Sequence, residues 1–248
     1  MSQLVLITGG SRGIGAATAL LAARQGYAVA VNYSANSLAA DEVVRQIRQA
    51  GGQAMAVQAD VAKEAQVVAM FEKIDAKFGR LSALVNNAGV VDQTTRVDAI
   101  SLQRLQRMFE INVFGSFLCA REAVRRMSTR YGGTGGSIVN VSSVAARLGA
   151  PGQYVDYAAA KGAIDTFTIG LSKEVAAEGI RVNAVRPGLI ETDIHASGGL
   201  PHRAREMAPQ VPMQRAGTAR EVAESIVWLL GESSSYTTGA LLDVTGGR

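Results

Sequence analysis

Residues 4–15 of this 248-residue chain read LVLITGGSRGIG. The first four residues are apolar and predict a short buried strand, the glycines predict a turn, and residues 16–26 (AATALLAARQG) are typical of a helix. A glycine turn between a strand and a helix lets backbone N–H groups approach a phosphate, which the positive end of the helix then faces. The stretch therefore predicts an α/β fold with a nucleotide site at its first strand–helix junction.

The rest of the chain repeats this order of a short apolar run followed by a helical pattern. The runs are rich in valine, isoleucine and leucine and lack polar alternation, so they resemble strands that are buried on both faces. Seven such runs occur, at residues 4–7, 28–33, 53–59, 83–86, 137–141, 181–185 and 241–244. Repeated strand–helix–strand units predict one α/β domain over residues 1–248, built on a doubly wound, parallel, seven-stranded sheet flanked by helices.

Three helices between the runs carry clear signals. One has a single apolar stripe, made by Val67, Phe71, Ile74 and Phe78. Another opens with a capping box, in which Thr218 caps the helix and Glu221 closes the box. A third is predicted from about Asp156 onward by the spacing of Ile164, Phe167, Leu171 and Val175.

One segment, from about residue 190 to residue 217, departs from the pattern. It contains three prolines and three glycines, has no long apolar stripe, and follows the strand at 181–185. Long irregular insertions in compact domains are usually functional, and ligands bind beyond the carboxyl ends of parallel strands, so we expect a substrate lid here. Its cationic side chains either meet an anionic substrate or are ordinary polar residues of a loop: His195, His202, Arg203 and Arg205.

The charge and composition limit the kind of partner. The net charge is only +4 and 5% of residues are aromatic, which argues against nucleic-acid binding. The most basic stretch, residues 121–130 (REAVRRMSTR), is either an anion-binding patch or a solvated helix face. No grouping of histidine, cysteine and carboxylate has metal-ligand spacing, so no metal is predicted.

Cysteine usage and hydropathy bear on the compartment. Cys119 is the only cysteine, which excludes an intrachain disulfide and fits a reducing environment, and its apolar neighbours predict a buried structural thiol. No run of about eighteen apolar residues and no signal-peptide pattern is present. We therefore expect a cytoplasmic protein with no membrane partner.

The glycine turn suggests a dinucleotide cofactor and gives a hint of which one. The common G-x-G-x-x-G pattern fails because Thr18 stands at its third position; the spacing present is Gly9, Gly13, Gly15. An acidic residue after the second strand would bind the ribose of NAD, but residues 32–36 (NYSAN) contain none. Arg12 can pair with a 2′-phosphate and Ser34 can donate a hydrogen bond to it, so NADP is predicted, with NAD possible.

Two further strand ends are candidates for contact with this cofactor. Asp60 and Val61 end the third strand, where an adenine amino group can be bound, although Asp60 can instead cap the following helix. The sequence NNAG at 86–89 ends the fourth strand, and its asparagines hold neighbouring backbone or line the cofactor cleft.

The stretch QYVDYAAAK (153–161) contains a candidate acid–base group. On a helix, Tyr157 and Lys161 stand at i and i+4 and share one face, whereas Tyr154 precedes the helix and lines the substrate pocket or packs. A free phenol has a pKa near ~10, and a nearby ammonium lowers it, as general acid–base catalysis requires. The alternative is a surface pair on a helix. Ser143, after the fifth strand, can reach the same cleft, although the sequence alone hardly separates it from Ser142.

Taken together, six motifs resemble the short-chain dehydrogenase/reductase family, near the bacterial 3-oxoacyl-carrier-protein reductases and glucose 1-dehydrogenases. The resemblance covers essentially the whole chain and rests, in order, on TGGSRGIG (8–15), NNAG (86–89), the asparagine of EINVFG (110–115), NVSS (140–143), YAAAK (157–161) and RPGLIET (186–192). It implies a single-domain Rossmann fold, hydride transfer to or from a nicotinamide, and a homotetramer.

The resemblance also implies the roles of individual residues. Tyr157 would be the catalytic acid/base, Lys161 would lower its pKa and bind the nicotinamide ribose, Ser143 would orient the carbonyl or hydroxyl, and Asn112 would hold a water linked to Lys161. Without the family, Asn112 would be interpreted as a polar kink in a helix. The residues that match cofactor contacts are Gly9, Ser11, Arg12, Gly13, Ile14, Gly15, Tyr33, Ser34, Asp60, Val61, Asn87, Ala88, Gly89, Tyr157, Lys161, Pro187, Gly188, Ile190 and Thr192.

One departure from the family pattern concerns the pocket wall. The interval from Ser143 to Tyr157 is one residue longer than is common, which bears on the choice of serine and on the wall around Tyr154. The expected substrate is a small carbonyl compound or alcohol, with 3-oxoacyl reduction and sugar or polyol oxidation as rivals. The alternative from another class is a nucleotide sensor without turnover, which has no need of the Tyr157–Lys161 pair.

Overall fold

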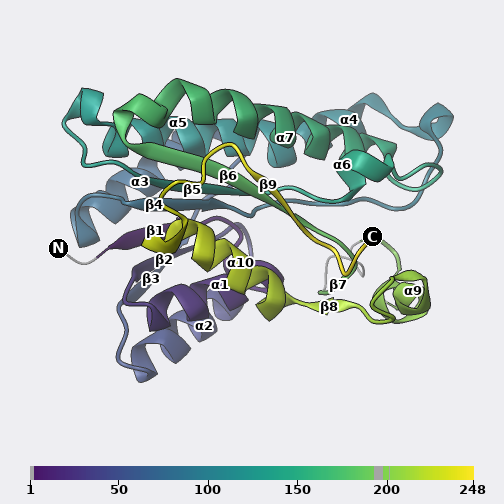
Figure 1. Ribbon diagram of the computed structural model, residues 1–248, viewed down its shortest axis with the longest axis horizontal. Coiled ribbons are helices and arrows are strands. Elements are labelled where there is room, and N and C mark those ends of the chain that lie inside the picture. Colours follow the sequence, from purple (N-terminus) through teal and green to yellow (C-terminus); the bar gives the residue numbers. More distant parts are fainter. Residues whose placement is uncertain (1–2, 193–197, 201) are drawn as a thin grey trace.

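The computed structural model describes residues 3–192, 198–200 and 202–248. Its main sheet runs in the order β3-β2-β1-β4-β5-β6-β9, and every neighbouring pair is parallel (Figure 1). The strands are β1 (Leu4–Ile7), β2 (Ala28–Tyr33), β3 (Ala54–Gln58), β4 (Ala83–Asn86), β5 (Gly136–Val141), β6 (Ile180–Pro187) and β9 (Leu241–Val244). The predicted seven-stranded parallel sheet is confirmed.

Helices cover both faces of this sheet, which is why its strands are apolar on both sides (Figure 1). On one face lie α1 (Gly13–Arg24), α2 (Ser37–Gln49) and α10 (Ala219–Leu230); on the other lie α3 (Glu64–Phe78), α4 (Leu102–Phe109), α5 (Gly115–Met127) and α7 (Val155–Val175). Within β1, Val5 and Ile7 belong to the core on the first face, while Leu4 and Leu6 belong to the core on the second. The result is one doubly wound Rossmann-type domain.

The helix signals in the sequence are reproduced. In α3, Val67, Phe71 and Ile74 are buried against the sheet and Phe78 is half-buried. At the start of α10, the Thr218 hydroxyl accepts a hydrogen bond from the Glu221 N–H at 3.2 Å, and the Glu221 carboxylate accepts one from the Thr218 N–H at 2.8 Å. The predicted capping box is therefore confirmed.

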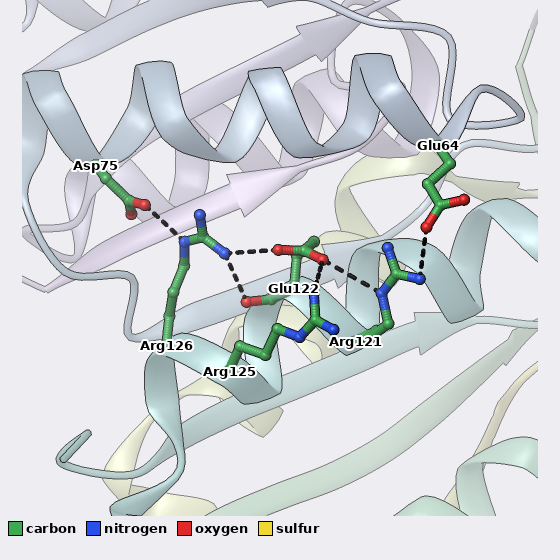
Figure 2. Close-up of polar contacts among 6 residues, drawn as sticks. All are labelled: Glu64, Asp75, Arg121, Glu122, Arg125 and Arg126. Atoms are coloured by element: carbon green, nitrogen blue, oxygen red, sulfur yellow. Dashed lines mark hydrogen bonds and ion pairs between the residues drawn. The ribbon is translucent and has the colours of Figure 1, made fainter. Parts of the chain in front are cut away.

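The basic stretch at 121–130 forms an ion-pair network between α3 and α5. Figure 2 shows its six side chains, Glu64, Asp75, Arg121, Glu122, Arg125 and Arg126. Arg126 donates to Asp75 at 2.7 Å and to the carboxylate of Glu122 at 3.0 Å, and only 5% of the Glu122 side chain is exposed. The solvated-face alternative fits Arg125 and Arg130, which are exposed, whereas Glu122 and Arg126 are largely buried between the two helices.

The two ends of the segment after β6 pair with each other in a small sheet that the sequence did not predict. Strands β7 (Ile190–Glu191) and β8 (Gly217–Thr218) pair in parallel, and α9 (Arg203–Met207) lies between them in the chain. Two residues are too few to give a strand pattern. His195, one of the candidate substrate contacts, lies outside the described residues. Among the described residues, no helix is long and apolar enough to cross a membrane.

Candidate active site

A cavity of about 540 Å³ opens at the carboxyl ends of the central strands. Its lining includes Ile14 from the glycine loop, Asn87 and Gly89 after β4, and Ser143 after β5. Tyr157 and Lys161 of α7 also line it, as do Pro187 at the end of β6 and three residues that follow, Gly188, Ile190 and Thr192. The size lies in the usual range for a cofactor or small-molecule pocket. This is the edge at which a parallel sheet of this type binds ligands.

Tyr157 and Lys161 face this cavity together. The Lys161 ammonium lies 5.6 Å from the centroid of the Tyr157 ring, and it donates a hydrogen bond to the Val141 carbonyl at 2.8 Å. Only 4% of Lys161 is exposed, which is rare for a lysine without a functional or structural partner. The alternative of a surface pair is therefore wrong.

The environment changes the pKa values of both groups. Burial raises the pKa of the Tyr157 phenol to about 12, while a hydrogen bond with Ser143 acts in the lowering direction. Burial lowers the pKa of Lys161 to about 8, and the charge of Asp165 acts against that shift. The prediction that Lys161 lowers the pKa of Tyr157 is wrong for this structure, because burial outweighs the lowering influence present, which comes from Ser143. The phenol therefore keeps its proton at neutral pH, and Lys161 remains mainly an ammonium there.

The two serines after β5 have different environments. The Ser142 hydroxyl is buried and donates to the Lys161 carbonyl at 3.2 Å, so it fixes the backbone of α7. Ser143 is half-buried, hydrogen-bonds with Tyr157 and accepts from the Ala145 N–H at 3.1 Å. This geometry favours Ser143 as the group that meets a substrate oxygen, despite the longer interval to Tyr157.

Asn112 lies in a π-helical turn, η2 (Glu110–Phe114), between α4 and α5. It is fully buried; its amide donates to the carbonyls of Val90 and Met108 at 3.0 Å each, and its oxygen accepts from the Val90 N–H at 3.1 Å. A Cβ placed on Gly89 would stand 2.7 Å from the Asn112 oxygen and 3.5 Å from the Lys161 nitrogen. The helix irregularity expected from the sequence is present, and it brings Asn112 to the same place as Lys161.

The glycine loop is packed too tightly for side chains. Gly9 and Gly13 have φ of +60° and +53°, which favours glycine. A Cβ on Gly15 would collide with the Gly9 carbonyl and stand 2.6 Å from the Asn87 amide nitrogen. That amide donates to the carbonyls of Thr8 and Gly9 at 2.9 and 3.0 Å, so Asn87 holds neighbouring backbone, one of the two roles considered for it.

The other predicted cofactor contacts lie around this loop. Ser11 and Arg12 belong to it, with Arg12 exposed at the N-terminus of α1, and a Cβ on Gly13 would stand 3.4 Å from the Thr192 methyl across the cleft. The remainder lie at the ends of neighbouring strands: Tyr33 is the last residue of β2 and Ser34 follows it, Asp60 and Val61 come after β3, and Ala88 comes after β4. The helix-cap alternative for Asp60 is wrong, because Lys63 is the N-cap of α3 and the Asp60 carboxylate accepts from the Ala62 N–H at 3.0 Å.

Three supporting residues were missed in the sequence. The Asn32 amide donates to the Ala59 carbonyl at 3.0 Å and its oxygen accepts from the Gly9 N–H at 3.2 Å, so Asn32 joins the glycine loop to β3. Asn32 could have been found from the sequence as a polar residue inside an apolar run.

Arg104 donates twice to buried Asp156, at 2.7 and 3.1 Å, and so fixes the first turn of α7 ahead of Tyr157.

The fold and this site define a nicotinamide-dependent oxidoreductase, and comparison with known proteins identifies its family. A family model described as enoyl-(acyl carrier protein) reductase matches residues 9–248. The oxidoreductase YgfF of Escherichia coli (strain K12), named as uncharacterised, is 59% identical over 245 residues, covering 99% of each chain. A 3-oxoacyl-(acyl-carrier-protein) reductase of Synechocystis sp. is 40% identical over 247 residues, covering 99% of this chain and 96% of the relative.

A solved structure agrees with these relatives. A mutant short-chain dehydrogenase/reductase of Serratia marcescens matches with a TM-score of 0.90 at 32% identity, over 99% of this chain and 97% of its own. The chain belongs to the short-chain dehydrogenase/reductase family. It is an NAD(P)-dependent oxidoreductase acting on CH–OH or C=O groups. The resemblance found in the motifs is confirmed, including its position near the 3-oxoacyl reductases and glucose 1-dehydrogenases.

Proposed function

We propose that this protein is an NADP(H)-preferring oxidoreductase in which Tyr157 is the acid/base for a small carbonyl compound or secondary alcohol. The observation that carries this proposal is the convergence of Ser143, Tyr157 and Lys161 on one cavity beside the glycine loop. A protein that only senses a nucleotide needs the loop but not this trio.

The residues divide the chemistry of carbonyl reduction between them. The glycine loop and the residues after β6 would hold a reduced nicotinamide dinucleotide, which would supply the hydride for the carbonyl carbon. Tyr157 donates its phenolic proton to the carbonyl oxygen, and Ser143 donates a hydrogen bond that holds this oxygen in place. The Lys161 ammonium, 5.6 Å from the ring, favours the phenolate that remains, and buried Asn112 keeps the backbone around Gly89 in place beside it. Oxidation of the alcohol runs the same steps in reverse.

A substrate screen tests the proposal. Ketones, 3-oxoacyl thioesters, sugars and polyols are supplied with either nicotinamide cofactor, and the absorbance of the reduced nicotinamide is followed. We expect turnover of at least one class of small carbonyl compound or secondary alcohol, faster with the NADP(H) form. Tight cofactor binding with no turnover across the panel would instead support the nucleotide sensor.

The NADP preference is predicted to depend on Arg12. Its guanidinium is exposed at the start of α1, and no acidic residue occurs in the segment after β2 (residues 33–36). Arg12→Ala should weaken NADPH binding by about 10- to 100-fold, the value of one charge-assisted contact with a phosphate, and leave NADH binding nearly unchanged. Fluorescence titration of both cofactors measures this, with Arg24→Ala at the far end of α1 as the matched control. If the ratio of the NADPH affinity to the NADH affinity does not change, Arg12 does not bind the 2′-phosphate.

Two structural features support the remaining expectations of a lid and a homotetramer. The β7–β8 pair joins the two ends of the 190–217 segment, and described residues of this segment line the cavity, among them Thr192, Arg203 and Met207. Exposed apolar side chains gather on the layer formed by α4, η2, α5 and α7, among them Leu102, Phe114, Phe117 and Ile169. Such a surface favours assembly of identical chains. A single-chain mass by light scattering would contradict the homotetramer.

A further inference from the structure

The described side chains that line the cavity carry charges of one sign only. The described lining includes three cationic side chains, Lys161, Arg203 and Arg248, and no aspartate or glutamate. Lys161 is buried beneath Tyr157 and belongs to the acid–base group. Arg203 and Arg248 are therefore available to bind a ligand in the rest of the cavity.

Arg203 has a defined position in this cavity. Its guanidinium carbon lies 5.4 Å from the centroid of the Tyr154 ring, within the range of a cation–π contact. Tyr154 is the N-cap residue of α7, and it lines the same cavity as Tyr157. Arg203 therefore shares the cavity with the acid–base group and contacts the tyrosine at the start of its helix.

Helix α9 holds Arg203 on the side of the cavity. In α9 the next residue, Ala204, is buried in a small apolar cluster with Leu189, Val211 and Ala216. Arg205, on the same short helix, is exposed and is absent from the cavity lining. Among the described residues, no carboxylate forms an ion pair with Arg203. A bound substrate would remove water from this guanidinium, and a charge that loses water without gaining a partner is costly. An anionic group on the substrate would be that partner.

The neighbours of Arg203 limit the size and kind of that anion. Apolar side chains of Leu148, Met207 and Leu189 line the same cavity, and a carboxylate fits the two parallel donors of a guanidinium. We propose that the substrate is a small oxo- or hydroxy-acid, whose carboxylate binds Arg203 while its carbonyl or carbinol carbon lies at Tyr157. This rests on the proposed function for the reaction, and it adds the class of substrate.

Matched substrates and matched variants test the proposal. The substrates are 4-oxocyclohexanecarboxylate and its methyl ester, and 4-oxopentanoate and its methyl ester, so that the members of a pair differ by the negative charge and one methyl group. The variants are Arg203→Met and, on the exposed side of α9, Arg205→Met. We expect the wild type to favour the acids in kcat/KM by about 10- to 100-fold, the value of a charge-assisted hydrogen bond pair. In Arg203→Met this ratio should fall close to one, mainly through KM, while Arg205→Met keeps it.

A binding measurement separates this inference from the proposed function. Cyclohexanecarboxylate, which has no carbonyl to reduce, should bind the cofactor-loaded wild type and Arg205→Met in calorimetry, and bind Arg203→Met at least tenfold more weakly. If neutral ketones are reduced but acids have no advantage, the inference fails and the proposed function stands. If the carboxylate binds through Arg203 but no ketone, thioester, sugar or polyol turns over, the proposed function fails instead. A rise in the KM for cofactor in Arg203→Met with an unchanged acid-to-ester ratio would overturn the inference, because Arg203 would then serve the cofactor.

Discussion

Replacing Tyr157 with phenylalanine is expected to lower kcat by about 10³-fold, within the range of general acid–base catalysis. The substitution removes one oxygen and leaves the ring, which lies 5.6 Å from the Lys161 ammonium, in its place. Ser143, which hydrogen-bonds with Tyr157, and Lys161 remain beside the lost phenol as proton donors, and Tyr154 of the same cavity is tested separately. Steady-state kinetics with the best substrate from the screen measure the effect.

The neighbouring tyrosine supplies the control. Tyr154 lines the same cavity but lies before α7 and lacks a lysine one turn further on, so Tyr154→Phe should keep kcat within about tenfold of the wild type. Cofactor affinity should be nearly unchanged in Tyr157→Phe, which shows that the variant is folded. A Tyr157→Phe enzyme with full turnover would end the catalytic assignment.

Gly15→Ala is expected to weaken cofactor binding by about 100-fold or more. The added methyl group would collide with the Gly9 carbonyl and press on the Asn87 amide at 2.6 Å. Backbone on both sides of the loop would have to shift, and overpacking of this kind costs about 1–3 kcal/mol before any contact with phosphate is lost. The affinity for NADPH is measured by fluorescence titration, and circular dichroism shows whether the variant is folded.

A second glycine tests whether the effect belongs to the loop. At Gly231, after α10, a Cβ would meet its nearest atoms at 3.6 and 3.7 Å, which are ordinary contact distances, and φ is −80°. Gly231→Ala should therefore leave the affinity unchanged. A folded Gly15→Ala protein that binds NADPH as the wild type does would show that the loop can widen without losing its function.

The sheet could be predicted because its strands are buried on both faces. That burial demands apolar residues at consecutive positions, as in LVLI (4–7), and a helical pattern follows each run. The strands β7 and β8 have two residues each, so their pairing depends on the fold around them and leaves no local pattern. The network around Glu122 was missed for a related reason, since Asp75, the other partner of Arg126, lies far away in the sequence on α3.

Part of the site was also readable from local spacing. Tyr157 and Lys161 are one helical turn apart, so the sequence alone places them on a shared face. Asn112 needed the family resemblance, because nothing in EINVFG indicates that its amide meets the backbone at Val90. The inward position of Arg203 and the outward position of Arg205 depend on the packing of Ala204, which only the three-dimensional structure gives.

The contacts of Asn87 bear on how the protein acquires its cofactor site during synthesis. The residues of the glycine loop are made first, yet the amide that holds Thr8 and Gly9 comes 79 positions later than Thr8. Strand β1 likewise needs β4 beside it before both of its edges are paired. A nascent chain that ends before residue 87 therefore carries the nucleotide-binding sequence without the support that shapes it. Competence to bind the dinucleotide should appear on the ribosome only after the fourth strand has emerged.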